Sequence, residues 1–508
     1  MIARKSALII GTNIIDGLLG YIGLYFITRY MSPEAYGIMG FAYSFVALFT
    51  IFADLGFDNA HIKRASEENR DLGTCIGTFL SVKLGLTGIL AIVTVSSVFF
   101  WKIVVGRGFE SHTHELAIYL MLGYWIFRIL ARAIIRTPQA RKKIAKVQIP
   151  LLLESIVRVV ATVFVALNRY GPIELVLTYI AGGAVFFIAS LFMMRGYTIK
   201  KPSKEYFKDY SKFAFPVIIA MGCSLIITNS DKVIIQLFWN AEDVGYYFSA
   251  FRLAEFISMF SLAIHTLLFP TISNLHSKKD FIKIKLLTLK SERYLSMIVF
   301  PMVFGLIVLA EPAVKILLSD WVPAYPILQI LPLMMIFTAL EIPYQSHFLG
   351  TDQPKIVRNR VFLMVLFNIA LNFILIPRDI NSLGITLFGW GARGAAVATV
   401  ISYFIGLLYS RYMAWKLNKI KGSPVIFLHA IAAAVMVLCL YTLLHTFQFL
   451  PFVDRWYILL AVSFLGLGIY IFVLCLLHEF TKKDLKFFLE TLNIKKMLQY
   501  IMEELRGK

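Results

Sequence analysis

Three arginines recur at every fourth position of an apolar stretch, at Arg128, Arg132 and Arg136. On an α-helix this spacing places the three guanidinium groups on one face. Like charges arranged in this way repel one another, so we expect an anionic group opposite them. Guanidinium groups bind phosphate oxygens through paired, charge-assisted hydrogen bonds. The spacing therefore indicates a surface that binds a phosphorylated ligand.

The next apolar stretch carries a carboxylate, Glu154, four residues before a further arginine, Arg158. Glu154 could face the three arginines or pair with Arg158 along its own helix, as residues four apart do. One carboxylate cannot neutralise several guanidinium groups, so the region should be net positive. Arg136, nearest the helix end, is instead expected at the membrane interface, where long basic side chains extend toward water. We expect Arg128, Arg132 and Arg158 to contact substrate.

Further ionisable side chains interrupt other apolar stretches. At the bilayer centre such a group costs roughly 2.5–3.5 kcal/mol, so each one is a functional hypothesis. In the second half of the chain, Lys232 and Arg252 are expected to join the substrate-binding cations. With their acidic neighbours they could form either a structural network or an outer gate. The candidate coupling or gating carboxylates are Asp16, Asp54, Glu154, Asp231, Glu255 and Glu341.

Motifs for other kinds of chemistry are missing from the sequence. It has no G-x-x-x-x-G-K-[ST] phosphate loop, no H-E-x-x-H motif and no nucleophile–base arrangement. Its four cysteines are scattered, which favours neither a metal site nor a disulfide framework. We therefore expect no enzyme, no catalytic residues, no metal ligands and no cofactor. A proton (H+) or sodium (Na+) gradient could drive turnover, since one charge crossing 100 mV releases about 2.3 kcal/mol, and passive equilibration is equally open.

Composition predicts the elements that must position these groups. Of 508 residues, 59% are hydrophobic and 16% are charged, and the mean hydropathy is +0.75. Soluble chains are about half apolar and a quarter charged, so we expect an all-α integral membrane protein. Apolar runs of about 18 residues or more predict about 14 transmembrane helices. Their expected ranges are 8–28, 38–56, 78–100, 115–135, 148–167, 174–193, 213–237, 244–269, 291–318, 327–349, 360–377, 393–413, 425–447 and 456–477.

Lysine and arginine gather in alternate connections between these helices. The connections "RTPQARKKIAK", "HSKKDFIKIK" and "KLNKIKGS" are basic, whereas "NRYGP" and "NAED" carry little positive charge. Because basic loops stay in the cytoplasm, we expect both termini there, in a multi-pass protein of the cell (plasma or inner) membrane. The net charge of +20 then reflects loops beside anionic membrane lipids rather than a nucleic-acid partner. The segment 480–505 predicts an amphipathic helix on the membrane or a solvated tail.

A short sequence recurs half a chain apart. The stretch "MSPEAYGIMGFAYSF" at 31–45 aligns with "WNAEDVGYYFSAFRL" at 239–253, which matches Gly37 with Gly245. Each copy follows an odd-numbered predicted helix, so the two halves should have the same orientation in the membrane. Glycine and acidic residues favour turns in any context, so a chance similarity is the alternative.

Several stretches together resemble a known family: "ITRYMSPEAYG", "DLGF", "NSDKVIIQLFWNAEDVGYYFSAFRLAE" and "LGTDQPKIVRN". They are similar to the polysaccharide-biosynthesis flippases, the Wzx-type members of the multidrug/oligosaccharidyl-lipid/polysaccharide (MOP) exporter superfamily. The resemblance covers the first twelve helices. It implies two parallel six-helix lobes in a V-shaped, MATE-like arrangement, followed by two C-terminal helices. The implied function is translocation of a polyprenyl-pyrophosphate-linked oligosaccharide to the outer leaflet by alternating access, for assembly of cell-surface polysaccharide or glycan.

This architecture divides the chain into five parts: an N-lobe at 1–194, a cytoplasmic linker at 195–212, a C-lobe at 213–415, two helices at 425–478 and a basic tail at 479–508. The lipid-linked oligosaccharide is the implied partner, with other glycan-assembly membrane proteins as further candidates. Two alternatives stay open. A cation-coupled multidrug or small-molecule exporter belongs to the same superfamily, but its cavity should be acidic rather than lined by arginine. A membrane glycosyltransferase or polymerase would need a large catalytic outer loop, and the predicted outer loops are short.

Overall fold

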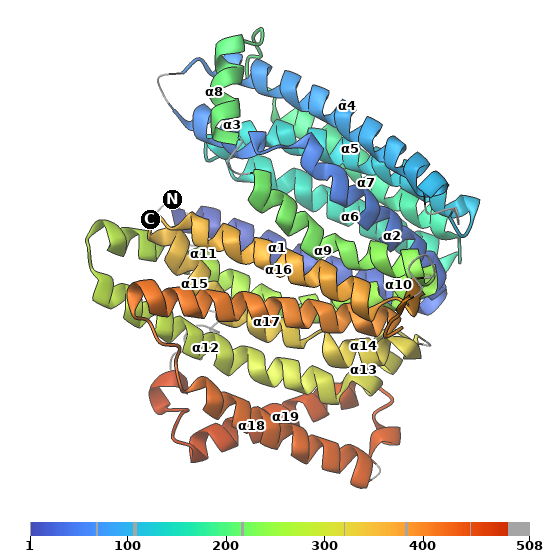
Figure 1. Ribbon diagram of the computed structural model, residues 1–508, viewed down its shortest axis with the longest axis vertical. Coiled ribbons are helices and arrows are strands. Elements are labelled where there is room, and N and C mark those ends of the chain that lie inside the picture. Colours follow the sequence, from blue (N-terminus) through green and yellow to red (C-terminus); the bar gives the residue numbers. More distant parts are fainter. Residues whose placement is uncertain are drawn as a thin grey trace. The chain divides into compact units, whose positions relative to one another are not determined.

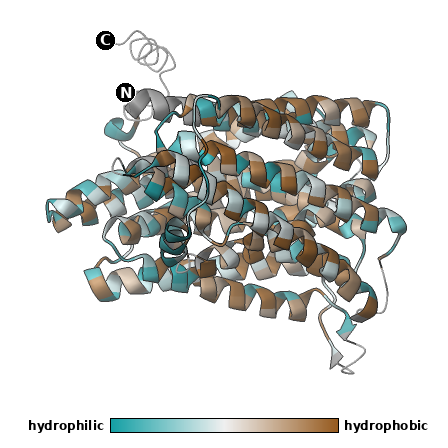
Figure 2. Ribbon diagram, turned by 90° about the horizontal axis from the view of Figure 1, so that it is seen from above, coloured by the Kyte–Doolittle hydropathy of each residue, from teal (hydrophilic) through white to brown (hydrophobic). Residues whose placement is uncertain are grey.

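The computed structural model describes residues 2–67, 70–104, 109–214, 218–319, 321–380, 385–447 and 449–485. Over these ranges the chain is helical apart from one short antiparallel pair, β1 (Asp379–Ile380) with β2 (Ile385–Thr386). Eleven of the described helices are long and apolar enough to cross a membrane. In Figure 2, hydrophobic residues run along the helices, and hydrophilic residues concentrate at the helix ends and in the connections. This distribution is the one expected of membrane-spanning helices. The chain is an all-α membrane protein.

The chain divides into two compact units, Met1–Gly245 and Tyr246–Lys508, and the boundary falls inside α10. The elements of the first unit, blue to green in Figure 1, are α1 (Ile2–Tyr30), α2 (Pro33–Phe49), η1 (Thr50–Ala53), α3 (Phe57–Ser66), α4 (Leu72–Val104), α5 (His112–Ala140), α6 (Ala145–Leu167), α7 (Pro172–Met193), α8 (Lys204–Ala214), α9 (Ile218–Phe238) and the start of α10 (Ala241–Glu255).

Helix α7 lies at the centre of the first unit, packed against both α5 and α6. Helix α1 covers α6, and α2 packs against α5 and α9. The short helices α3 and α8 pack against each other and against α4, where Phe57, Phe79 and Tyr210 form a buried apolar cluster. The long helices thus hold the charged positions of α5 and α6 inside one bundle.

The second unit, green to red in Figure 1, continues the helical architecture. After the end of α10, its elements are α11 (Ser258–Ser277), α12 (Phe281–Val308), α13 (Ala310–Leu317), η3 (Val322–Ala324), α14 (Tyr325–Ile330), α15 (Leu333–Gly350), α16 (Pro354–Leu375), β1, β2, α17 (Gly391–Asn418), α18 (Ile426–Tyr441), the π-turn η5 (Thr442–Thr446), η6 (Leu450–Phe452) and α19 (Trp456–Leu476). Helix α15 packs against α11, α12 and α17, while α18 and α19 pair with each other.

Several helix boundaries differ from the expected ranges. The run expected at 244–269 is broken between Glu255 and Ser258, although no proline or glycine marks the break. Helix α12 begins at Phe281, about three turns before the expected start at 291, because the Asp280 carboxylate accepts a hydrogen bond from the Lys283 amide at 3.1 Å and caps the helix. Part of the basic "HSKKDFIKIK" connection is therefore helical. The predicted amphipathic tail lies mostly outside the described residues, which end at 485.

The two copies of the repeated sequence begin their helices in the same way. The Ser32 hydroxyl accepts a hydrogen bond from the Ala35 amide at 3.1 Å, and the Asn240 side-chain oxygen accepts one from the Asp243 amide at 2.8 Å. In the repeat alignment Ser32 matches Asn240 and Ala35 matches Asp243. Short polar side chains at the N-cap satisfy amides that the first helical turn leaves free. The similarity of the two stretches is thus also a similarity of backbone geometry.

Candidate functional site

The arginine face of α5 meets α6 inside the first unit. The Arg128 guanidinium donates to the carboxylate of Glu154 and to the hydroxyl of Tyr124, and that hydroxyl also lies 3.1 Å from Glu154 Oε1. Tyr124 and Glu154 are buried, while 19% of the Arg128 side chain is exposed. Of the two partners open to Glu154, the structure thus pairs it with Arg128 across the helices.

Arg158 has a different carboxylate beside it, from a helix far away in the sequence. Its guanidinium nitrogen lies 4.0 Å from Asp16 Oδ1 on α1, and the same Asp16 carboxylate accepts a hydrogen bond from the Ser155 hydroxyl. The guanidinium carbon also lies 5.2 Å from the centre of the Tyr179 ring, a favourable cation–π position. Asp16, Arg128, Glu154 and Arg158 therefore belong to one cluster, which α1, α5 and α6 build and which we call the arginine cluster.

The other two arginines of α5 differ from each other. Arg132 follows Arg128 by one turn on the same face of α5, and we include it in the arginine cluster. Arg132 is exposed, and no carboxylate of the described residues forms an ion pair with it. Arg136 leaves the arginine cluster and binds Asp58 of α3 at 2.8 Å. Counting Arg132 with the arginine cluster, three guanidinium groups face two carboxylates, Asp16 and Glu154. The site keeps an excess positive charge.

Aromatic rings flank the arginine cluster on α2, α5 and α7. The Tyr43 ring lies 5.1 Å from that of Trp125, and the Tyr124 and Tyr179 rings meet edge to face at 5.4 Å. Such rings combine an apolar face with polar edges that can hydrogen-bond. The sequence analysis missed them, because aromatic residues are frequent in this chain and nothing in their spacing distinguishes these four.

Two adjacent glycines of α7 allow the helices of the site to approach closely. A Cβ atom on Gly182 would come within 3.0 Å of the Cβ of Arg158, and one on Gly183 would come within 3.0 Å of the Tyr124 ring. Small residues let membrane helices pack backbone to backbone. Gly182 and Gly183 thus set the distance between α5 and α6, and with it the contact between Arg128 and Glu154.

A second buried cluster of charges lies where α3, α4 and α5 meet. The Lys83 ammonium lies 3.2 Å from Asp54 and 3.0 Å from Asp58, and Arg136 completes the set on the other oxygen of Asp58. Lys83 is only 2% exposed. Burial by itself would raise the pKa of Asp58, but Lys83 and Arg136 outweigh it and hold that pKa well below its usual range. Asp54, a candidate coupling carboxylate, is therefore part of a structural ion network.

A histidine extends this second cluster, which we call the Lys83 cluster. The buried His61 ring lies 3.1 Å from the Tyr210 hydroxyl and 2.9 Å from the Thr137 hydroxyl, and stacks on Phe79 at 4.1 Å. Burial lowers the pKa of His61 to about 3, with a smaller opposing effect from Asp58. The ring is neutral near pH 7 and joins α3 to α5 and α8.

The second unit holds the remaining acidic candidates in pairs. Glu341 on α15 binds Arg360 on α16 at 2.7 Å, and both side chains are buried. Arg252 and Glu255 pair along α10 at 2.9 Å with about two fifths of each side chain exposed. Glu341 is buried between α15 and α16, so a change in its charge would disturb the packing of these two helices.

Asp231 and Lys232 lie on α9 in the first unit and are almost completely buried. The Lys232 ammonium donates to the backbone carbonyl of Thr228, one turn earlier. The expected interlocking of these two residues with Arg252 and Glu255 stays a prediction.

Sequence reasoning missed several ion-pair members that are buried or partly buried. They are Lys83, Glu292, Arg360 and Arg411, of which Glu292 accepts from Arg411 at 2.6 Å and from the Tyr344 hydroxyl at 2.9 Å. Lys83 could have been found, because it is the only charged residue of the apolar run at 78–100. The other three lie near the ends of apolar runs, where basic and acidic residues are common and carry less information.

These observations define a multi-pass membrane protein with charged groups held inside its helical bundles. Comparison with known proteins is consistent with this class. A family model described as "Polysaccharide biosynthesis protein" matches residues 26–326. The probable low-salt glycan biosynthesis flippase Agl15 of Haloferax volcanii is 24% identical over 81% of this chain and 84% of its own length.

Solved structures identify the fold. The lipid II flippase MurJ, in an inward closed conformation, superposes with a TM-score of 0.73 at 18% identity, over 94% of this chain and 99% of its own. An inward-facing multidrug resistance MATE family transporter of the MOP superfamily gives a TM-score of 0.66 at 15% identity, over 80% and 96% of the two chains. The expected MATE-like fold is confirmed.

The chain belongs to the polysaccharide biosynthesis protein family, since the family model matches more than half of it. The resemblance predicted from the sequence is thus confirmed. This is a family of membrane transporters and not of enzymes, which removes the glycosyltransferase or polymerase alternative.

Proposed function

We propose that this chain translocates a polyprenyl-pyrophosphate-linked oligosaccharide from the cytoplasmic to the outer leaflet, for assembly of cell-surface polysaccharide or glycan, by alternating access. The observation that carries the proposal is the arginine cluster, in which Arg128, Arg132 and Arg158 outnumber the carboxylates Asp16 and Glu154. A pyrophosphate presents several anionic oxygens, and guanidinium groups match their geometry. The family match and the similarity to Agl15 support this substrate class.

The contacts suggest an order of events. Arg132, which is exposed, meets the pyrophosphate first. Arg128 and Arg158 then exchange their carboxylate partners for phosphate oxygens, and Glu154 and Asp16 are released. Such an exchange keeps every guanidinium paired, but it leaves the carboxylates of Glu154 and Asp16 without their guanidinium partners. Tyr43 and Tyr179 provide faces beside the bound head group.

A released carboxylate can take up a proton or a cation, which gives the arginine cluster a means of coupling to an H+ or Na+ gradient. Asp16 is the better candidate of the two, because 57% of its side chain is exposed and it can exchange with water. Asp54, Asp231, Glu255 and Glu341 stay candidates for coupling or gating. Lys232 and Arg252 are proposed as substrate cations of the later half.

The proposal includes a topology. Eleven candidate spans, with α1, α9 and the α10–α11 pair added, give fourteen crossings. We propose that both termini lie in the cytoplasm, where the basic connections would be, and that the helices form two parallel six-helix lobes in a V (1–194 and 213–415) with two further helices at 425–478. Other glycan-assembly membrane proteins are proposed as partners.

A cation-coupled exporter of small molecules is the second candidate, and the MATE-like fold favours it. A cationic drug would require an acidic site, whereas the arginine cluster has more guanidinium groups than carboxylates. Charge therefore distinguishes the two functions, since an anionic lipid head group is attracted by this site and a cation is repelled.

Reconstitution in vesicles tests the proposal. Purified protein is inserted into vesicles that contain a fluorescent polyprenyl-pyrophosphate oligosaccharide, and the leaflet exchange of the lipid is followed by quenching from outside. We expect the protein to exchange this lipid between the leaflets. Coupled transport would make the rate of exchange depend on a pH or sodium gradient. Export of cationic dyes with no exchange of the lipid-linked sugar would instead establish the second candidate. Arg132→Ala should abolish lipid exchange, while Arg169→Ala, in a connection away from the arginine cluster, should retain it.

A further inference from the structure

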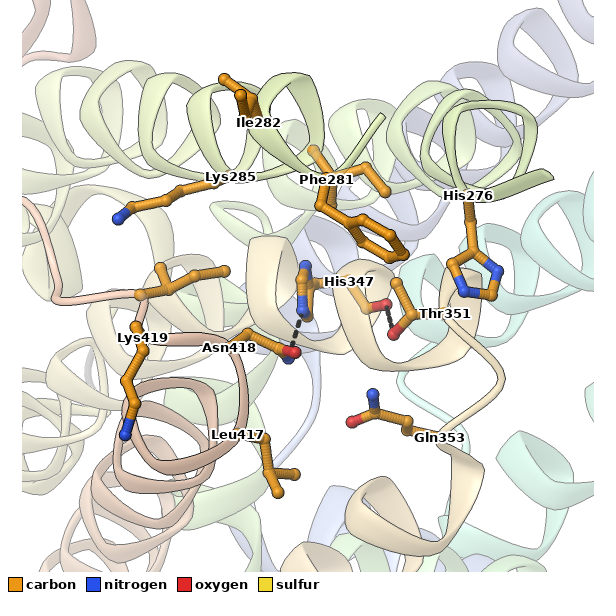
Figure 3. Close-up of a pocket in the computed structure, with 12 residues that line it drawn as sticks. His276, Phe281, Ile282, Lys285, His347, Thr351, Gln353, Leu417, Asn418 and Lys419 are labelled. Carbon is orange, nitrogen blue, oxygen red and sulfur yellow. Dashed lines mark hydrogen bonds between the residues drawn. The ribbon is translucent and has the colours of Figure 1, made fainter. Parts of the chain in front are cut away.

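A pocket of about 390 Å³ opens in the second unit, among the ends of α11, α12, α15 and α17 (Figure 3). It lies beside two lysine-rich segments, one between α11 and α12 and one that follows α17. Its lining includes Phe281, Ile282, Lys285, His347, Leu417 and Lys419. The lining thus joins positive charge, a buried imidazole and apolar side chains in one cavity.

The charge of this pocket is positive. Lys285 and Lys419 are exposed, and neither forms an ion pair with a carboxylate of the described residues. The described lining contains no acidic residue. Asp352 lies 3.8 Å from the His276 ring at the edge of the pocket, and its side chain is 92% exposed. Asp280, which precedes the lining residue Phe281, pairs with Lys283 at 2.7 Å. An anion in the pocket would therefore meet two ammonium groups without a competing carboxylate.

His347 supplies a hydrogen-bond donor inside the pocket. Its Nε2 lies 2.7 Å from the Asn418 Nδ2 group, which can only donate, so the neutral imidazole carries its proton on Nδ1. The residue is 3% exposed, and Nδ1 has no hydrogen-bond partner among the described residues. Figure 3 shows the ring between Asn418 and the start of α12, facing the pocket. A buried donor without an acceptor costs free energy, and an anionic oxygen would remove that cost.

The apolar lining distinguishes between kinds of anion. Phe281, Ile282 and Leu417 are 59%, 76% and 49% exposed and lie next to the two lysines. A small free anion would leave these side chains uncovered, whereas a lipid would place its glycerol and acyl carbons against them. Basic pockets between transmembrane helices bind the head groups of anionic lipids in this way.

We propose that this pocket binds the phosphate group of an anionic membrane phospholipid. Lys285, Lys419 and the Nδ1–H of His347 contact the phosphate oxygens, and Phe281 and Ile282 contact the glycerol end of the acyl chains. The inference does not depend on the transported substrate, because the ligand is a bulk lipid and the pocket lies wholly within the second unit.

Native mass spectrometry of the full-length protein in detergent tests this site. The protein is titrated with phosphatidylglycerol and, separately, with phosphatidylcholine of the same acyl chains. We expect preference for phosphatidylglycerol, and an affinity for it about 10- to 30-fold lower in the double variant Lys285→Ala/Lys419→Ala, with binding of phosphatidylcholine unchanged. His347→Phe keeps an aromatic ring and removes the donor, and should weaken the binding of phosphatidylglycerol by about tenfold.

The matched control is Lys290→Ala/Lys416→Ala, which removes the same charge from exposed positions of α12 and α17 outside the pocket lining. It should bind phosphatidylglycerol within about twofold of the unmodified protein. An equal loss in both double variants would overturn the site, because overall charge would then explain the preference. Displacement of the lipid by inorganic phosphate at comparable affinity would also overturn it, in favour of a soluble phosphate ligand.

Discussion

Gly37 of α2 and Gly245 of α10 lie so close together in the first unit that neither position has room for a side chain. A Cβ atom on Gly37 would overlap the carbonyl oxygen of Ala241, and one on Gly245 would overlap the carbonyl oxygen of Pro33. The same two glycines match each other in the repeated sequence. The first turns of α2 and α10 therefore pack against each other, and each supplies the small residue that the backbone of the other requires.

Gly37→Ala should destabilise the protein in spite of the higher helix propensity of alanine. Overfilling a tight contact costs about 1–3 kcal/mol, because the two backbones must separate. Thermal unfolding in detergent measures the effect as a lower Tm. Gly85→Ala on α4 is the matched control, since a Cβ atom there meets open space, and its Tm should not fall. Equal Tm values for the two variants would contradict the close contact.

Arg132→Ala should separate function from stability. Arg132 is exposed and has no carboxylate partner among the described residues, so its removal should change the free energy of unfolding by less than about 0.5 kcal/mol. Lipid exchange in vesicles should nevertheless be lost, because the first contact with the pyrophosphate is removed. Exchange at the rate of the unmodified protein would refute the role of Arg132.

Arg128 and Glu154 should show strong coupling in a double-mutant cycle. Removal of one member of a buried pair costs about 3–5 kcal/mol, because the other charge stays buried without a partner. We expect Arg128→Met and Glu154→Gln each to lower the stability, and the double variant to recover a large part of the loss. Additive effects of the two substitutions on the free energy of unfolding would show that the pair is not coupled.

Lys83→Met should lower the free energy of unfolding, although it replaces a charged residue by an apolar one on an apolar helix. It would leave Asp54 and Asp58 close to each other with only Arg136 to balance them, at a cost of about 3–5 kcal/mol. Lys102→Met, on the same helix but at a side chain that is 44% exposed in its pair with Glu115, is the control and should cost less than about 1 kcal/mol. The fraction of membrane-inserted protein that remains folded after purification measures the difference between the two variants.

The stability should decrease when the pH falls below about 6.5. His61 has a pKa of about 3 in the folded protein and 6.5 when exposed, so below pH 6.5 the unfolded chain takes up a proton that the folded chain does not. Asp58 adds to the loss at lower pH, because its depressed pKa stabilises the folded state only while the unfolded carboxyl, with a pKa of 3.8, is ionised.

A series of Tm measurements between pH 7.5 and about pH 4 follows this loss. His61→Phe should make the decline between pH 6.5 and about pH 4 less steep, because it removes the contribution of His61. The exposed His112 at the start of α5 serves as control, and His112→Phe should leave the decline unchanged. A decline as steep in His61→Phe as in the unmodified protein would contradict this contribution.

The sequence was sufficient to predict features that depend on residues close together along the chain, such as the membrane helices and the charged residues that share one helix. Long apolar runs predict membrane helices because hydrocarbon leaves the backbone no other partner, and the fold agrees with them. The four-residue spacing correctly placed Arg128 and Arg132 on one helix with Glu154 and Arg158 on the next. The break between Glu255 and Ser258 could not be predicted, because no proline or glycine lies there and tertiary packing decides where the run bends.

The sequence could not predict which charged side chains pair between different helices. The sequence left two possible partners for Glu154, the arginine face of α5 and Arg158. The packing of α7 against α5 and α6, set by Gly182 and Gly183, brings Glu154 to Arg128. The pairing of Arg158 with Asp16 joins residues on α6 and α1, and no spacing rule connects them. Lys83 is a different case, because its place in an apolar run was visible and pointed to a buried partner.

The order of the Lys83 cluster along the chain has a consequence for biogenesis. The acids Asp54 and Asp58 leave the ribosome before Lys83 does, and Arg136 follows only later. Inserted alone, α4 would carry its ammonium into the lipid at a cost of roughly 2.5–3.5 kcal/mol. A nascent hairpin that retains α2, α3 and α4 at the translocon brings the neutralising acids with it, so these segments are expected to enter the bilayer together rather than one by one.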